Sequence, residues 1–266
     1  MNLKGDPKLK HPFKRLISEI EVSQEFVKRL ENSEPQKVTE KDFHQLSKSF
    51  PQPVLIRSSG TMVGLTPVKV GNQKYFIPEP DPIVLNYNIA YEHWRSLRDA
   101  DPAQFAKLQN AMQVEDHRNL LYSYCGRAIT FITSLFTAVE ATLNRAIPSD
   151  YIHVRIETKQ SVSRNKQQLM EFASFTDKLQ VIKAATGKDF MKHPLQYEKI
   201  NKLKELRDMI IHPKDASDQL SKYPELYSRL FRIHFADTLL AVKAFVNYYA
   251  GEDVIRDCDC GMTKND

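Results

Sequence analysis

Glycine is scarce in this chain, with only eight glycines among 266 residues, and this scarcity limits the folds open to it. Glycine allows the positive φ of tight turns and the close approach of backbone to a phosphate group. Neither G-x-G-x-x-G nor G-x-x-x-x-G-K occurs, so the two common nucleotide-binding loops are absent from the sequence. Hydrophobic residues make up 41% of the chain, which is enough to bury a core. The scarcity of glycine for tight turns predicts a mainly α-helical fold.

Proline and glycine mark the ends of helices in the second half of the chain. Ser174 and Asp177 form a capping pair, and Gly187 is placed to end the helix that they begin. Apolar residues at helical spacing predict four helices over residues 127–147, 174–187, 194–212 and 224–251, the last of them the longest. The segment between the first two of these helices, residues 150–165, is expected to form a loop or an irregular hairpin. Four helices joined by such connections predict an up-down four-helix bundle.

The first part of the chain differs from this pattern. Apolar spacing predicts a helix over residues 13–30, whereas Pro53 to Pro78 predicts a β-meander with a hairpin turn at Gly71. Asp81–Pro82 and Asp101–Pro102 are typical of helix starts. We therefore expect a smaller N-terminal α+β appendage over residues 1–82, connecting helices over 83–118, the bundle over 119–255 and a tail over 256–266.

Neither an export signal nor a metal site is evident. The first residues are polar, and the longest apolar stretch is shorter than the roughly 20 residues of a membrane span. Cys125 is isolated, and the C-x-C of Cys258 and Cys260 lacks a second pair of ligands nearby. We expect a cytoplasmic protein that needs neither metal nor cofactor and does not insert into a membrane.

Positive charge is concentrated in one segment. Residues 155–214 contain 13 lysines and arginines against seven acidic residues, a balance of +6, whereas the whole chain carries +5. A phosphate-bearing partner explains this concentration, although solvated helix faces explain it as well.

The end of the third predicted helix combines groups suited to phosphodiester chemistry. Leu206, Met209, Ile210 and Ile211 are expected to form its buried side, which leaves Arg207, Asp208 and His212 for another face. Pro213 disfavours helical geometry at His212 and so ends the helix there. Asp208 lies four residues before His212 and is expected to hydrogen-bond the imidazole. Arg207 offers a planar guanidinium that suits a phosphate.

An arginine followed after four residues by a histidine, at the end of a bundle helix, resembles the signature of the HEPN superfamily (higher eukaryotes and prokaryotes nucleotide-binding). Arg207-x-x-x-x-His212 matches it, with Asp208 as the polar residue that the family often has after arginine. The helix that contains Glu140 and Asn144 is similar to the family's earlier helix. The resemblance covers about residues 118–251.

The resemblance implies a metal-independent endoribonuclease in a toxin–antitoxin, phage-defence or RNA-processing setting. It implies a homodimer in which two motifs share one groove, with Arg207 and His212 as catalytic residues. Asp208, Glu140 and Asn144 would support them, and an antitoxin or another regulatory protein is a possible partner. Lys202, Lys204 and Lys214 are the expected contacts to RNA.

Helical geometry favours pairing of chains independently, because residues five apart point about 140° apart around a helix. Two alternative functions without catalysis remain open. The protein could be a bundle that binds a nucleotide or a protein, or a module whose nucleotidyltransferase partner is a separate chain. Some family toxins carry a tyrosine two residues after the histidine as the target of such a transferase; Lys214 stands there in this chain. In the simplest interpretation both residues are structural: Arg207 pairs with an acidic residue on a neighbouring helix, and His212 caps the C-terminal end of its own helix.

Overall fold

A computed structural model describes residues 20–21, 54–56, 61–98, 107, 109, 113–157, 160–214, 220–250 and 254–255. The chain divides into two compact units, with the boundary between residues 82 and 83. The described part is mainly helical. None of the described helices contains an apolar stretch that could span a lipid bilayer. The predicted helix start at Asp101–Pro102, and the tail with Cys258 and Cys260, lie outside the described residues.

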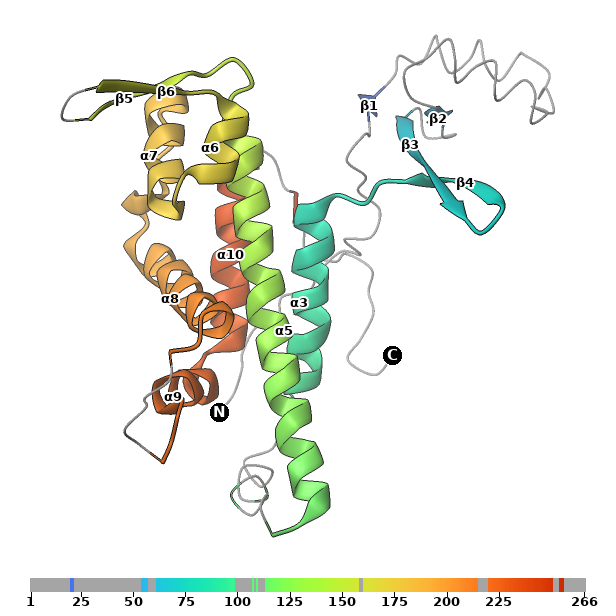
Figure 1. Cartoon of the computed structure of the whole chain (residues 1–266), viewed down its shortest axis with the longest axis vertical. Coiled ribbons are helices and arrows are strands. Elements are labelled where there is room, and N and C mark those ends of the chain that lie inside the picture. The colour runs from blue at the N-terminus through green and yellow to red at the C-terminus, as the bar shows by residue number, and fades with distance from the viewer. Residues whose placement is uncertain are drawn as a thin grey trace. The chain divides into compact units, whose positions relative to one another are not determined.

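The described part of the N-terminal unit is an antiparallel sheet (Figure 1). The predicted hairpin turn is present, because Gly71 has a φ of 60° and Val70 pairs with Gln73 across it. The prediction of a helix over residues 13–30 is wrong at Ile20 and Glu21, which form a strand paired with Met62 and Thr61. The rest of that range lies outside the described residues. Pairing with a distant strand overrides the local apolar spacing here. The strands are β1 (Ile20–Glu21), β2 (Val54–Ile56), β3 (Thr61–Val70) and β4 (Gln73–Pro78).

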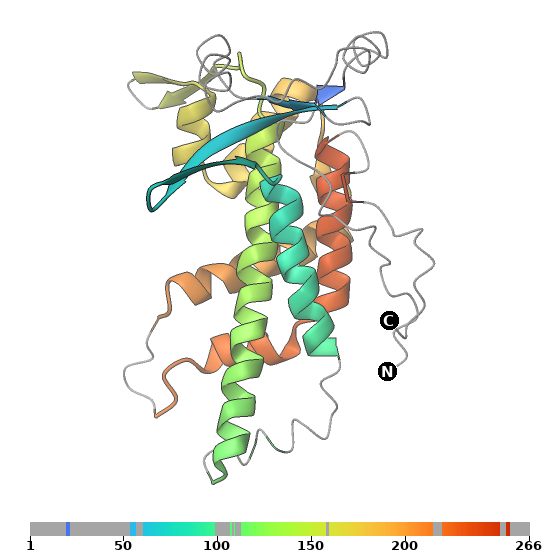
Figure 2. The ribbon, with the colours of Figure 1, turned by 90° about the vertical axis from the view of Figure 1, so that its right-hand side faces the viewer.

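One long helix, α5 (Glu115–Ala146), organises the second unit. Helix α3 (Pro82–Arg98) and helix α10 (Phe235–Ala250) run alongside it in both views (Figures 1 and 2). Their apolar faces form part of the core, whose largest fully buried side chains include Tyr87, Phe131, Phe136 and Phe245. The hydroxyl of Tyr87 donates to the carbonyl of Leu239, which joins α3 to α10 inside this core.

The C-terminal end of α5 is followed by a hairpin and two helices. The segment predicted as a loop or hairpin forms strands β5 (His153–Glu157) and β6 (Gln160–Arg164). Helix α6 (Lys166–Phe172) follows, and α7 (Phe175–Thr186) packs on α5. The predicted capping pair of α7 is present: the Ser174 hydroxyl accepts from the Asp177 amide, and the Asp177 carboxylate accepts from the Ser174 amide. Gly187 ends α7 with a φ of 74°.

Helix α8 (Pro194–Ile211) follows the short 3-10 helix η2 (Phe190–Lys192) and ends directly before His212, as the sequence predicts. It crosses α5 obliquely in Figure 2 and packs against both α5 and α10. Its buried face consists of Ile200, Leu203 and Leu206. Ile211, expected on that face, is 49% exposed, because the last turn of α8 extends past the core.

The long helix predicted over residues 224–251 is two helices in the structure. Helix α9 (Pro224–Arg232) ends at Ile233, which is extended with φ −65° and ψ 133°, and α10 begins after His234. The longest of the described helices is therefore α5. The break lets α9 turn onto α8, where the Arg229 guanidinium reaches the Glu205 carboxylate at 2.7 Å. Neither proline nor glycine occurs at this break, so the sequence carries no local signal for it.

Candidate functional site

Arg207 lies on α8 where this helix crosses α5, and its guanidinium has contacts on three sides. Its Nη1 donates to Asp208 Oδ1 at 3.1 Å, and its Nη2 lies 3.8 Å from Glu140 Oε2 on α5. Its Cζ lies 5.4 Å from the centroid of the Phe136 ring, one turn before Glu140. The side chain remains 30% exposed. The guanidinium is thus held in one place and still accessible to solvent.

Glu140 belongs to a polar layer between α5, α7 and α8. Lys178 on α7 is only 5% exposed, and its Nζ donates to the carbonyl of Met170 at 2.9 Å. Burial lowers the pKa of Lys178, while the negative charge of Glu140 acts in the opposite direction. The Glu140 carboxylate therefore pairs with Arg207 and is near enough to Lys178 for its negative charge to oppose the effect of burial on the pKa of Lys178. Asn144, one turn later on α5, has a buried Oδ1 without a hydrogen-bond partner among the described residues.

The expected hydrogen bond between the carboxylate of Asp208 and the imidazole of His212 is absent. Asp208 instead accepts from Lys204 Nζ at 2.7 Å and from Arg207 at 3.1 Å. Side chains on a helix lean toward its N-terminus, which directs Asp208 to Lys204 one turn earlier. His212 has left helical geometry, with φ −124° and ψ 66°, so its ring is not in the position that i to i+4 spacing assumes.

Asp208 is held in its charged form by these contacts. Burial by itself raises the pKa of the Asp208 carboxyl, but the hydrogen bonds from Lys204 and Arg207 outweigh burial and lower the pKa below its ordinary value. Asp208 thus helps to fix Arg207, and not His212.

His212 and Lys214 lie on the wall of a groove. The groove has a volume of about 630 Å³ and lies between the end of α8 and the start of α9. The His212 imidazole and the Lys214 ammonium are exposed, and neither forms a hydrogen bond or ion pair with any residue that the structure describes. The lining residues are Asp208, Met209, His212, Pro213, Lys214, Lys222, Tyr223, Pro224, Glu225 and Leu226.

The predicted site residues therefore fall into two groups. Arg207 lies beside Glu140, whereas His212 and Lys214 line the groove. Asp208 belongs to both groups, because it contacts Arg207 and also lines the groove. Of the expected RNA contacts, Lys202 pairs with Glu198 at 2.5 Å and Lys204 pairs with Asp208, so both already have carboxylate partners within α8. Lys214 is the one of these three lysines that is unpaired among the described residues.

Three parts of the site were not predicted from the sequence: Lys178, Phe136 and the wall of the groove that α9 provides. Lys178 could have been found, because it lies on the apolar stripe of Phe175, Leu179 and Ile182, where a charged residue needs a partner. The α9 wall could not be found from the sequence, since it depends on the break at Ile233.

Comparison of the chain with family models, with curated proteins and with solved structures found no match.

Proposed function

We propose that this chain is a metal-independent endoribonuclease of HEPN type that cleaves RNA through its 2′-hydroxyl group. The observation that carries the proposal is the end of α8, where an imidazole without a partner among the described residues lies beside a groove and a fixed, accessible guanidinium lies five residues earlier. The proposal includes a HEPN-like four-helix bundle built from α5, α7, α8 and α10. The contacts of α5 with the other three helices are compatible with it.

The proposed reaction transfers two protons. The neutral imidazole of one His212 removes the proton of the ribose 2′-hydroxyl, and the 2′-oxygen attacks the adjacent phosphorus. The bond from phosphorus to the 5′-oxygen breaks, and the protonated imidazole of a second His212 supplies the proton to this leaving oxygen. Arg207 neutralises the charge on the phosphoryl oxygens in the transition state. The products are a 2′,3′-cyclic phosphate and a free 5′-hydroxyl.

The proposal requires two copies of the chain. Arg207 faces Glu140 on α5, whereas His212 lines the groove, so the two groups of one chain diverge as their spacing on the helix implies. A two-fold axis near the ends of both α8 helices would bring two imidazoles and two guanidinium groups to one phosphate. Lys214 beside this site would hold the neighbouring phosphate of the RNA.

The test is cleavage of single-stranded RNA by purified protein in EDTA. We expect wild type to produce cyclic-phosphate ends and to leave RNA with 2′-deoxyribose at the cleavage site intact. His212→Ala is expected to lower the rate by about 100-fold or more, the scale of general acid–base catalysis. His193→Ala is the matched control, because His193 also precedes a proline, at the opposite end of α8. If wild type and His212→Ala leave RNA equally intact, the proposed enzymatic function is wrong.

One observation favours a second candidate, a non-catalytic bundle that binds a protein partner. Met209, Tyr223, Pro224 and Leu226 make much of the groove wall apolar, and exposed Tyr227 lies on the same short helix. An apolar groove beside an exposed aromatic residue suits the side chains of a helical peptide. This candidate predicts that Leu226→Asp abolishes partner binding while His212→Ala leaves it unchanged.

A further inference from the structure

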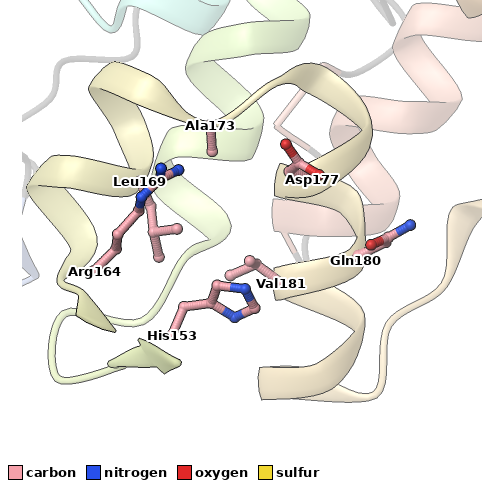
Figure 3. Close-up of a pocket in the computed structure, with 7 residues that line it drawn as sticks. All are labelled: His153, Arg164, Leu169, Ala173, Asp177, Gln180 and Val181. Carbon is pink, nitrogen blue, oxygen red and sulfur yellow. The ribbon is translucent and has the colours of Figure 1, made fainter. Parts of the chain in front are cut away.

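A second concave site lies at the other end of the helical unit, among β5, β6, α6 and α7. Its volume is about 200 Å³. Figure 3 shows the His153 ring and Val181 at one end and Ala173 at the other, with Arg164 and Leu169 on one side and Asp177 on the other side. Gln180 completes the lining. None of these residues belongs to the groove at the end of α8.

The hairpin places two nitrogen-bearing side chains on this pocket. His153 and Arg164 are directly opposite partners in the antiparallel pairing of β5 and β6, so their side chains leave the same face of the hairpin. The Arg164 guanidinium forms neither an ion pair nor a hydrogen bond with any described residue. A guanidinium without a carboxylate partner on a pocket wall is suited to a carboxylate or phosphate group of a ligand.

The opposite wall presents a carboxylate in a fixed position. Asp177 Oδ2 accepts from the amide and the hydroxyl of Ser174, at 3.4 and 2.9 Å, in the capping box of α7. Asp177 Oδ1 has no hydrogen bond among the described residues. The capping box therefore holds the carboxylate in place while one oxygen stays available to a donor. In Figure 3 this carboxylate and the Arg164 guanidinium both lie near the Ala173 end of the pocket.

The volume and the remaining walls limit the ligand. A cavity of about 150 Å³ accommodates benzene, whereas sites for drug-sized ligands begin at about 300 Å³. A pocket of about 200 Å³ therefore fits a molecule with on the order of ten non-hydrogen atoms. Leu169 and Val181 offer apolar surface for part of it.

We propose that this pocket binds a small zwitterion of the α-amino acid type. Arg164 holds the carboxylate, Asp177 Oδ1 accepts from the ammonium group, and a short side chain lies on Leu169 and Val181 toward the His153 ring. A guanidinium and a carboxylate on facing walls complement the two charges of such a ligand, whereas a simple anion leaves Asp177 unmatched. The site is independent of the proposed ribonuclease activity.

The test is calorimetric titration of the full chain with each of the common α-amino acids, and with acetate and inorganic phosphate. We expect saturable binding of at least one amino acid with a small apolar side chain. Arg164→Gln and Asp177→Asn should each weaken it by about tenfold or more, as the loss of a charge-assisted hydrogen bond implies. Asp177→Asn retains an oxygen that can accept from Ser174. Arg127→Gln is the matched control, since Arg127 is an exposed arginine on α5 outside the pocket.

Three results would overturn the assignment. The first is an absence of binding of any amino acid up to about 10 mM, where the affinity is too weak to matter. The second is equal affinity in wild type and Arg164→Gln. The third is binding of acetate or phosphate as tightly as the best amino acid, which would show a site for anions in general. Circular dichroism of each variant separates loss of the site from loss of the fold.

Discussion

Replacing Glu140 with glutamine tests the polar layer that holds Arg207. The substitution keeps the shape of the side chain and removes its charge. In the wild type this charge lies 3.8 Å from Arg207 Nη2 and attracts the buried ammonium of Lys178. After the substitution Lys178 keeps its hydrogen bond to the carbonyl of Met170 and loses the anion that faces it.

The expected effect lies between two limits. Two unit charges at 3.8 Å attract each other by about 4 kcal/mol at an effective dielectric constant of about 20. Exposed ion pairs nevertheless contribute about 0–1 kcal/mol, whereas breaking a buried pair costs about 3–5 kcal/mol. The side chain of Glu140 is 38% exposed and that of Arg207 is 30% exposed, so solvent screens this pair. Lys178 is buried and is screened less. We therefore expect Glu140→Gln to lower the free energy of unfolding by about 1–2 kcal/mol at pH 7.

Urea denaturation followed by circular dichroism measures this change. A double-mutant cycle with Lys178→Met isolates the coupling, and in the Lys178→Met background Glu140→Gln should cost only the contribution of the remaining screened pair with Arg207, about 0–1 kcal/mol. Glu171→Gln on α6 is the control, because Glu171 is exposed and has no ion pair among the described residues. Equal effects of Glu140→Gln and Glu171→Gln would refute a role of the Glu140 charge in stability. An unchanged cost of Glu140→Gln in the Lys178→Met background would refute its coupling to Lys178.

Two further predictions concern pH and backbone conformation. The folded-state pKa of Asp208 is lowered, so its carboxylate stabilises the fold above its ordinary pKa of about 3.9, and this contribution disappears as the pH falls through the folded-state pKa. The urea midpoint of Asp208→Asn should therefore depend less on pH between about 5 and 2 than the midpoint of wild type. An equal pH dependence of the two midpoints would contradict a stabilising role of this carboxylate. A Cβ at Gly187 or Gly126 meets nothing within 4 Å, but Gly187 has a φ of 74° and Gly126 is inside α5. Gly187→Ala should thus lower the free energy of unfolding by about 1 kcal/mol, and Gly126→Ala should raise it by about 0.5–1 kcal/mol. If thermal denaturation shows that both substitutions shift the stability in the same direction, backbone conformation does not explain these effects.

Helix ends were predictable wherever their cause is local. Ser174 and Asp177 satisfy each other's backbone amides within four residues, and Gly187 adopts a left-handed conformation that other residues avoid. Pro194 and Pro213 restrict the backbone at both ends of α8. None of these effects needs a distant part of the chain.

The candidate site was predictable in part for the same reason. The arginine, the histidine and the proline that ends the helix are close in sequence, so their places on α8 follow from helix geometry. The partner of Asp208 was predicted wrongly, because i to i+4 spacing allows contact with Lys204 as well as with His212, and the geometry before Pro213 removes the second choice.

By itself, the sequence determined the mainly helical character of the second half, the caps of α7, the two ends of α8, and the display of His212 at a helix end. Each of these depends on interactions among neighbouring residues. Only the tertiary structure decided that Ile20 pairs with β3, that the last helical segment breaks at Ile233, and that Lys178 is buried near Glu140. These features join residues far apart in the chain. Their free energy comes from surfaces that meet only after folding, and local propensity does not reveal which surfaces those are.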